Sequence, residues 1–255
     1  MNHSSQATPS FTHTLTAFST SLTTAVDLPP SIDNQGILAG TALPRHYKSD
    51  ITFSVPDFQT ALDSTAHSLL GMVLCRHLTT GEILTARIVE IETYDQFDPA
   101  SHCYTGFTFR NRAMFTSPLH AYIYISHGIH SCMNISLGPL GVGAGALIRA
   151  VEPIDGVQTM EKFRNRTGTE VSNGPAKLCQ ALQITTELYG RDLSNPSSPL
   201  FLAEPLSSRK FPQEEIVATP RIGISKNASA LRRFVLADNP YVSAFHHTTD
   251  SLQVR

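Results

Sequence analysis

Two carboxylates and a phenol alternate along one short segment of the chain, Arg87–Tyr94. Its β-branched and apolar residues are typical of a strand, in which alternate side chains share a face. Glu90, Glu92 and Tyr94 then point the same way, and Ile88 lies on that face as well. If the strand lines a wet cleft, a carboxylate there can take a proton from water and stabilise developing positive charge. An edge or half-exposed strand with solvated glutamates is the alternative.

Further polar residues follow in the next part of the chain. A loop ends in His102, and in the segment Thr108–Phe115 the residues Arg110, Asn111 and Arg112 are flanked by apolar ones. Cations, an amide and apolar groups in one loop suit contact with phosphate and base together. A surface loop with two apolar anchors explains the same pattern, and lone histidines are more often structural than functional.

A hairpin is predicted around His127 and Gly128, because strand-forming residues precede and follow this turn signal. Its tip reads His-Gly-Ile-His, whereas hairpin tips are usually small and polar. Tyr122 and Tyr124 share one face of the first strand, where aromatic residues are also simply good strand formers.

The chain of 255 residues is 41% hydrophobic and 16% charged, which suffices for a core and excludes wholesale disorder. A net charge of −2 is not the signature of a general nucleic-acid binder. The charge is uneven, since residues 99–151 contain no Asp or Glu and residues 205–235 hold six cations against two anions. These stretches either form one positive face or belong to ordinary solvated surface.

The four cysteines are widely spaced and form no CxxC motif, so we expect reduced, mostly buried thiols rather than a zinc site or a disulfide scaffold. No apolar run approaches the ~18 residues of a membrane span, and the first 44 residues lack Lys and Arg, which argues against a signal or transit peptide. Twelve of the first 25 residues are Ser or Thr. We therefore expect a flexible Ser/Thr-rich tail over residues 1–44 and one folded domain over residues 45–255.

Hydrophobic periodicity and turn signals predict helices and strands in alternation over the folded part. In chain order they are a helix that starts at the N-cap Asp57 and stops at Gly71, strands at Met72–His77, Ile83–Tyr94, Tyr122–Ile125, Ile129–Ser136 and Ala146–Val151, a helix from Pro175 to Leu182, and strands at Pro220–Ile224 and Phe234–Leu236. Because hairpins join the strands, we expect an α+β domain with a curved, mostly antiparallel sheet flanked by helices.

Many of these segments match one family in order and approximate spacing. They are Arg87–Tyr94, Ala100–His102, Arg110–Arg112 with Met114 and Phe115, Tyr122–Tyr124, Gly128, Cys132–Asn134, Leu147–Pro153, Gly174–Leu182, Pro220–Ile224, Arg233 with Phe234, and Asn239–Ser243. Over roughly residues 61–243 the chain resembles the alkyladenine (3-methyladenine) DNA glycosylases. Each segment alone is weak, but so many in order are highly specific.

The resemblance implies a monofunctional DNA glycosylase of base-excision repair, which flips out alkylated purines and hydrolyses the N-glycosidic bond to leave an abasic site. Glu92 corresponds to the general base that activates water for attack on the sugar C1′. Arg149 and the backbone carbonyl of Ile222 correspond to groups that help hold this water. The implied substrates are 3-methyladenine and 7-methylguanine, with hypoxanthine and ethenoadenine left open.

Base recognition is implied for four further residues. Tyr94, His102 and Tyr124 correspond to residues that sandwich or contact the flipped base. Asn134 corresponds to an amide that crowds the exocyclic amino group of normal guanine.

A protruding, DNA-inserting β-hairpin is also implied. His127 stands where a family tyrosine often wedges into the duplex, and Arg110 and Met114 stand where the family contacts the DNA backbone and the opposite strand. The imidazole is a smaller plug than a phenol and can protonate near neutral pH. The low overall positive charge predicts weak non-specific DNA binding at physiological salt.

The expected partner is double-stranded DNA with damaged purines, bound by a monomer without a cofactor, a metal or a membrane contact. The expected location is the cytoplasm, at the nucleoid, in a bacterium and the nucleus in a eukaryote. No lysine lies in the strand–loop–hairpin segments to form a Schiff base, so we expect hydrolysis without strand cleavage.

Two alternatives remain open at this point. A catalytically silent nucleic-acid-binding module is disfavoured by the carboxylate at Glu92 and the guanidinium at Arg149. A metal hydrolase would use His127 and His130 with Glu92 or Asp98, but two residues between histidines at a turn do not place both on one face. Base release from methylated DNA tests the first alternative, and activity in excess EDTA tests the second.

Overall fold

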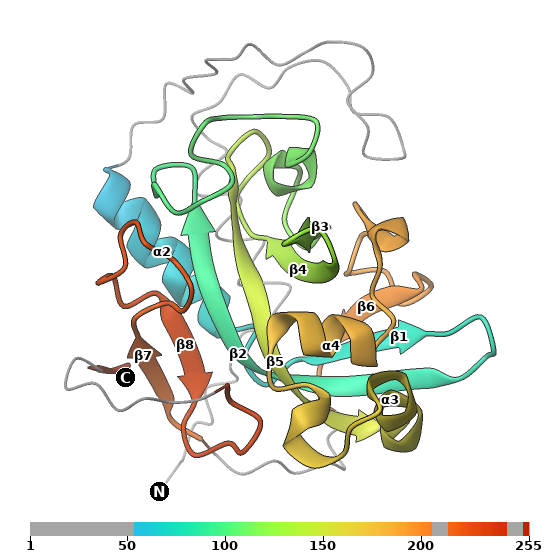
Figure 1. The fold of residues 1–255 in the computed structure, drawn as a ribbon. Helices are drawn as coiled ribbons and strands as arrows, with labels where there is room; N and C mark the ends of the chain where they lie inside the picture. The colour runs from blue at the N-terminus through green and yellow to red at the C-terminus, as the bar shows by residue number, and fades with distance from the viewer. Residues whose placement is uncertain (1–53, 206–213, 244–251, 255) are drawn as a thin grey trace, which may run out of the picture.

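The long strand β2 (Ile83–Asp95) runs through the middle of the structure (Figure 1). This computed structural model describes residues 54–205, 214–243 and 252–254, so the predicted tail over residues 1–44 lies outside the described residues. Within them, nine strands form one sheet that curls into a half-barrel, and every pair of neighbouring strands is antiparallel. The predicted α+β class with a curved antiparallel sheet is confirmed.

The sheet has one main path and one branch. Its main order is β3-β4-β5-β2-β8-β7-β9, and β1 pairs with both β2 and β6 beside that path. The remaining strands are β1 (Val73–His77), β3 (Ala121–Ser126), β4 (His130–Ser136), β5 (Ala144–Asp155), β6 (Leu200–Ala203), β7 (Ile216–Thr219), β8 (Arg233–Leu236) and β9 (Leu252–Val254). Consecutive strands β1–β2 and β3–β4 form the two predicted hairpins.

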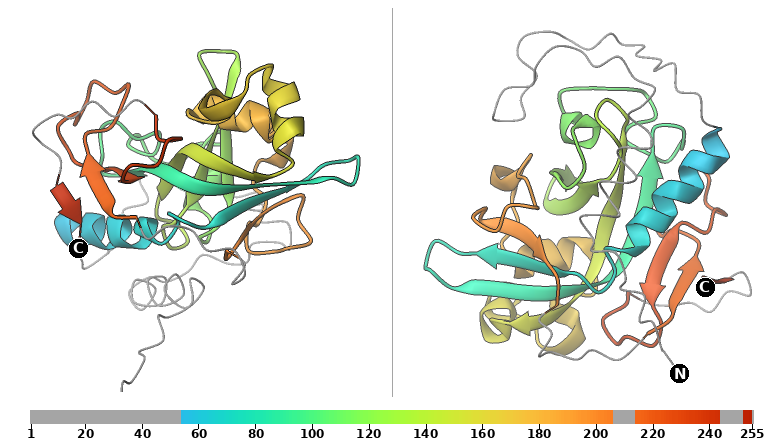
Figure 2. Two further views of the ribbon diagram at one scale, coloured as in Figure 1. Left: turned by 90° about the horizontal axis from the view of Figure 1, so that it is seen from below. Right: turned by 180° about the vertical axis from the view of Figure 1, so that it is seen from behind.

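Three α-helices of the described residues pack on the sheet. They are α2 (Val55–His67), α3 (Val157–Arg164) and α4 (Pro175–Ala181). Helix α2 lies against β2 and β5, whereas α4 lies against β4 and β5 beside α3, and the two views of Figure 2 show these groups well apart. Both groups bury apolar side chains in one core, which also takes in Ile91, Ile135 and Ile148 from the sheet.

The start of α2 and one of the strands differ from their predictions. The helix is capped by Ser54, whose hydroxyl accepts a hydrogen bond from the Asp57 amide, because Pro56 lacks an N–H and fits the first helical turn. The predicted strand Pro220–Ile224 is wrong: β7 ends just before it, since Pro220 cannot donate to a ladder. Helix α3 and strand β6 are additional elements that the periodicity did not indicate.

A β-bulge corrects the predicted faces of β2. The pairing with β5 shifts between Ile88 and Glu90 and again between Glu90 and Ile91. An inserted residue reverses the alternation of side chains, so Ile88 joins Ile91 in the main core instead of sharing a face with Glu90.

The four cysteines are free and buried, as predicted. None of the helices in the described part of the chain has the length and hydropathy needed to cross a bilayer.

Candidate active site

A row of directly paired residues crosses five neighbouring strands of the sheet. Strand pairing joins Tyr122 to Asn134, Asn134 to Leu147, Leu147 to Glu92, and Glu92 to Arg233. Directly opposed residues of antiparallel strands project from the same face. The row therefore gathers an aromatic ring, an amide and a carboxylate on one side of the curled sheet, away from the core residues Ile91 and Ile148.

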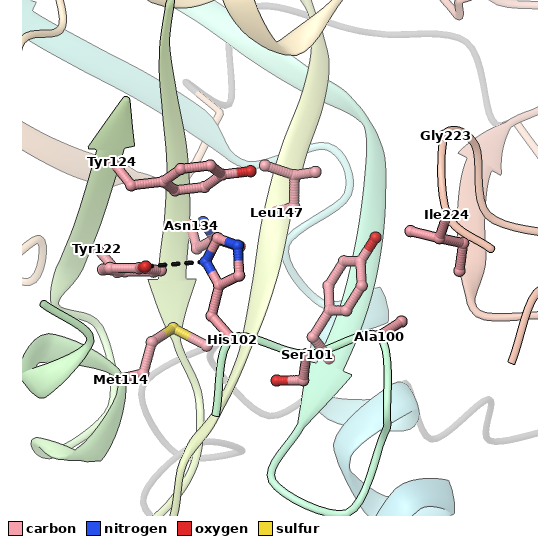
Figure 3. Close-up of a pocket in the computed structure, with 11 residues that line it drawn as sticks. Ala100, Ser101, His102, Met114, Tyr122, Tyr124, Asn134, Leu147, Gly223 and Ile224 are labelled. Carbon is pink, nitrogen blue, oxygen red and sulfur yellow. Dashed lines mark hydrogen bonds between the residues drawn. The ribbon is translucent and has the colours of Figure 1, made fainter. Parts of the chain in front are cut away.

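A pocket of 190 Å³ opens on this side of the sheet (Figure 3). It is lined by Tyr94, Ala100, Ser101, His102, Met114, Tyr122, Tyr124, Asn134, Leu147, Gly223 and Ile224. In Figure 3, Tyr122 and Tyr124 lie on one side and Gly223 and Ile224 on the other. Since a cavity of about 150 Å³ suffices for benzene, this pocket has room for a flat heterocycle.

The carboxylate of Glu92 lies behind the pocket and is fully buried. Its Oε1 accepts a hydrogen bond of 2.8 Å from the backbone N–H of Ile222 and lies 3.2 Å from Arg149 Nη1, and its Oε2 accepts one of 2.8 Å from the Tyr94 hydroxyl. A carboxylate offers about four acceptor positions. Three protein donors therefore leave one position for a water molecule.

The alternative of an edge strand with solvated glutamates is wrong, because Glu90 and Glu92 are fully buried, and of that strand face Tyr94 lines the pocket. Strand β2 is not at an edge, because β5 and β8 pair with it on either side in the sheet. Arg149 bridges the two carboxylates, with its Nε 2.9 Å from Glu90 Oε1 and its Nη1 3.2 Å from Glu92 Oε1. Glu90 also accepts hydrogen bonds from Arg233 and Ser243. A buried charge is tolerated only when it is paired in this way.

Tyr94 connects the carboxylate to the pocket. Burial, and then the charge of Glu92, raises the pKa of the Tyr94 phenol far above its ordinary value, so the hydroxyl remains a donor to that carboxylate. The guanidinium of Arg221 lies 4.5 Å from the centre of the Tyr94 ring. Arg221 is itself fully buried and paired with Asp98.

The opposite wall is a cluster of aromatic rings. His102 Nδ1 lies 2.9 Å from the Tyr122 hydroxyl, its ring meets Tyr124 edge-on at 4.7 Å between centroids, and the rings of Tyr122 and Tyr124 stack at 5.5 Å. Desolvation, and then the charge of Arg110, lowers the pKa of His102 below its ordinary value. His102 is thus a neutral imidazole at physiological pH.

Asn134 carries an unused donor. Its side chain is 5% exposed and lines the pocket, and no hydrogen-bond acceptor lies within reach of its buried Nδ2 among the described residues. Leaving a buried donor unpaired costs about 1–3 kcal/mol. A bound molecule or water that presents an acceptor would relieve this cost.

The floor of the pocket depends on a glycine. Gly145 is paired with Tyr94 across β5 and β2, and a Cβ there would come within 2.8 Å of Met114 Cε and 2.5 Å of the Ile135 carbonyl oxygen. Only glycine lets Met114 lie over the sheet at this point, where Met114 lines the pocket.

The structure separates the predicted site residues into three groups. Tyr94, His102, Met114, Tyr124 and Asn134 line the pocket, and Glu92, Arg149 and Ile222 meet behind it, although Ile222 contacts Glu92 through its N–H. Arg110 lies 5.9 Å from the Tyr124 ring. His127 stands apart from the pocket lining, in the turn between β3 and β4, with φ values of 50° at His127 and 75° at Gly128.

Sequence reasoning missed several residues that complete the site. The site residues predicted from the sequence did not include Tyr122 and Leu147, which belong to the cross-strand row, or the Arg221–Asp98 pair. Tyr122 had a signal, since it shares a strand face with Tyr124. The pairing of Leu147 with Glu92 and the Arg221–Asp98 contact join distant parts of the chain, and no local pattern indicates them.

Three of the six cations in the second predicted basic stretch are internal, whereas Lys226 is exposed and Arg209 and Lys210 lie outside the described residues. Arg221, Arg232 and Arg233 are at most 5% exposed and are paired with buried carboxylates. These cations are therefore not available to a partner. Exposed cations of the described residues include Arg110, in the acid-free stretch 99–151, and Lys226, two residues after the pocket-lining Ile224.

Within the described residues, no group of three or more His, Cys, Asp or Glu side chains is arranged to hold a metal ion. His127 and His130 are both exposed in the hairpin, apart from the buried Glu92 and Asp98.

Comparison with known proteins agrees with the geometry of the site. A family model described as methylpurine-DNA glycosylase (MPG) matches residues 56–240. A protein of Nitrosospira multiformis is 44% identical over 188 residues, which cover 73% of this chain and 91% of that protein. A protein of Carboxydothermus hydrogenoformans is 41% identical, over 70% of this chain and 91% of that protein. A protein of Methanoculleus marisnigri is 42% identical, over 71% of this chain and 92% of that protein. All three carry the name "Putative 3-methyladenine DNA glycosylase".

The chain is thus a DNA glycosylase, a hydrolase of the N-glycosidic bond in DNA repair. The chain belongs to the methylpurine-DNA glycosylase family. The resemblance stated from the sequence is confirmed.

Proposed function

We propose that this protein is a monofunctional glycosylase that flips alkylated purines, foremost 3-methyladenine and 7-methylguanine, out of duplex DNA. It hydrolyses their N-glycosidic bond with a water activated by Glu92 and leaves an abasic site. The observation that carries the proposal is the Glu92 carboxylate, which is buried, hydrogen-bonded to Tyr94 and placed directly behind an aromatic pocket.

Access to the pocket requires base flipping. A base inside a duplex cannot reach a pocket on the protein, and extruding it costs a few kcal/mol. The β3–β4 hairpin would fill the vacated space with His127, and Arg110 and Met114 would contact the backbone and the opposite strand.

The chemical step needs one carboxylate. Alkylation of a ring nitrogen weakens the glycosidic bond, so the base departs with little acid assistance and leaves an electron-poor sugar. Glu92 takes a proton from a water at its remaining acceptor position while Arg149 and the Ile222 backbone orient both, and the resulting hydroxyl adds to C1′. Before it takes the proton, the negatively charged Glu92 carboxylate also stabilises the cationic sugar.

Selection among bases follows from the lining of the pocket. A cationic alkylated purine gains roughly 0.5–2 kcal/mol from aromatic faces such as Tyr94 and Tyr124. Asn134 lines the pocket and its Nδ2 has no hydrogen-bond partner among the described residues, so the exocyclic amino group of guanine would place a second donor against this donor. Hypoxanthine and ethenoadenine lack that amino group and belong to the substrate panel of the test below.

Hydrolysis proceeds without strand cleavage, because the described residues that line the pocket include no lysine amine. The protein acts as a monomer on double-stranded DNA, in the nucleoid-containing cytoplasm of a bacterium or the nucleus of a eukaryote.

Single-turnover base release from duplexes that each carry one lesion tests the proposal. The wild-type protein should generate alkali-sensitive abasic sites and no breaks without alkali. Glu92→Gln keeps the shape of the side chain and removes the base, so release should fall about 10²–10⁴-fold, the usual contribution of general base catalysis. Glu170→Gln is the matched control, because Glu170 is an exposed carboxylate paired with Lys177.

Three results would contradict the proposal. They are full activity in Glu92→Gln, tight binding of lesion DNA by a wild-type protein that releases no base, and loss of release in excess EDTA.

A further inference from the structure

Phe109 is the most exposed large apolar side chain of the described residues, at 77% exposure. One face of its ring rests on the guanidinium of Arg112, whose carbon lies 3.9 Å from the ring centre. The same guanidinium lies 4.5 Å from the centre of the Tyr189 ring. Phe109, Arg112 and Tyr189 therefore form a stack whose outer ring faces solvent, and we call these three residues the Phe109 stack.

The loop under the stack is held firmly. Arg112 Nη1 donates to the Phe109 carbonyl at 2.7 Å, and the Tyr189 hydroxyl donates to the Arg110 carbonyl and accepts from the Ala113 amide. The buried amide of Asn111 donates to two further carbonyls of the loop. A ring that is fixed before a partner arrives loses little conformational entropy on binding.

The Phe109 stack lies beside the pocket. The loop between β2 and β3 carries Phe109 and Arg112, and the same loop supplies His102 and Met114 to the pocket lining (Figure 1). Arg110, the next residue after Phe109, lies 5.9 Å from the Tyr124 ring. A nucleotide inserted in the pocket would thus hold its neighbours in the strand close to this ring.

The chemistry around the ring favours nucleic acid as the occupant. Residues 99–151 contain no Asp or Glu, so cations and aromatic rings are the groups that this loop presents. A partner that combines negative charge with flat apolar faces can pair with the cations and stack on the aromatic rings. Exposed aromatic rings bordered by arginine are the usual platforms for base stacking.

We propose that the Phe109 stack is a second DNA contact, in which the open face of Phe109 stacks on a base of the duplex next to the flipped nucleotide. Arg112 backs the ring and places its positive charge near the adjoining phosphates. The stack holds the neighbouring base pair open while the damaged nucleotide occupies the pocket. This inference rests on the proposed function, since a flipped nucleotide defines which base is adjacent.

Binding to a duplex that carries a stable abasic-site analogue tests the inference without requiring base release. With 2-aminopurine beside the analogue, wild-type protein should change the fluorescence of the probe on binding. Phe109→Ala should raise the dissociation constant about tenfold, as expected for one lost base–aromatic contact, and should abolish most of that change. Phe109→Trp should retain both, because a larger ring can occupy the same place.

Two further variants separate stacking from charge and from exposure alone. Arg112→Lys keeps the charge but loses the planar backing, so its dissociation constant should lie between those of wild type and Phe109→Ala. Ile83→Ala removes an apolar side chain that is 46% exposed at the opposite end of β2 and should bind as wild type does.

The inference would be overturned if Phe109→Ala had the dissociation constant of wild type and caused the same change in 2-aminopurine fluorescence. This holds even if wild-type protein releases methylated bases. A wild-type protein that binds the duplex with the expected Phe109 dependence but releases no base would overturn the proposed chemistry and leave the stack intact. Equal losses in Phe109→Ala and Ile83→Ala would also overturn the inference, because they would indicate a general apolar effect.

Discussion

At the scale of single residues, the site is built from buried side chains of opposite charge that pair with one another. Glu92 and Glu90 share Arg149, and Asp98 pairs with Arg221 beneath the Tyr94 ring. Pairs of this kind add little net stability compared with apolar side chains, but breaking one leaves an uncompensated buried charge. Their value here is positional, because they orient the Tyr94 ring that lines the pocket and the Glu92 carboxylate bonded to it.

We predict that Arg221→Met lowers the free energy of unfolding by about 3–5 kcal/mol, since Asp98 would remain buried without its partner. Urea denaturation measures this change. The double variant Arg221→Met/Asp98→Asn should lose less than the sum of its two single variants, because neither charge remains. Additive losses would show that the two side chains do not interact.

At the scale of elements, the β3–β4 hairpin combines a regular turn with unusual residues. His127 and Gly128 both have positive φ, the geometry of a tight type I′ turn, and the Ile129 amide closes it on the Ser126 carbonyl. Asn-Gly and Asp-Gly are the usual pairs in such a turn. The turn thus keeps an imidazole at a place where a small polar residue would be more stable.

We predict that His127→Tyr speeds base release at low enzyme concentration several-fold, because a larger plug fills more of the space left by a flipped base. Stopped-flow fluorescence of a 2-aminopurine duplex measures flipping, and single-turnover assays measure release. Unchanged flipping and release in His127→Tyr would remove His127 from the wedge role.

At the scale of the whole molecule, helix α2, near the start of the described residues, packs against strand β8, near their end. His67, in its last turn, packs edge-on against Phe234 of β8 with 4.3 Å between ring centroids. Its Nε2 is buried, and no partner for it lies among the described residues. Desolvation lowers the pKa of His67 below its ordinary value of 6.5.

This contact predicts acid sensitivity. A lowered pKa means that the unfolded chain binds the proton first as the pH falls, so the stabilising effect of neutral His67 is present above pH 6.5 and is lost below it. Urea midpoints measured from pH 7.5 to 5 should fall on the acid side, with up to one proton taken up on unfolding. His67→Gln should flatten this part of the profile, and an unchanged slope would contradict the assignment.

Local patterns in the sequence were enough for most of the framework and for most of the residues that line the pocket. The long strand β2 and the two hairpins followed from nearest-neighbour preferences, and the family motifs named Glu92, Tyr94 and Asn134. The predicted N-cap of α2, Asp57, was wrong by three residues, and the predicted strand at Pro220–Ile224 is wrong, because turns and caps depend on single backbone contacts.

The sequence by itself determined the residue types at the site and the antiparallel class of the sheet, since both depend on short stretches of chain. Only the tertiary structure decided that the glutamates are buried, that Ile88 leaves their face and that Arg221 supports Tyr94. Burial, bulges and cross-strand pairs arise when distant segments meet, so the energies of these contacts cannot be predicted from a short stretch of sequence.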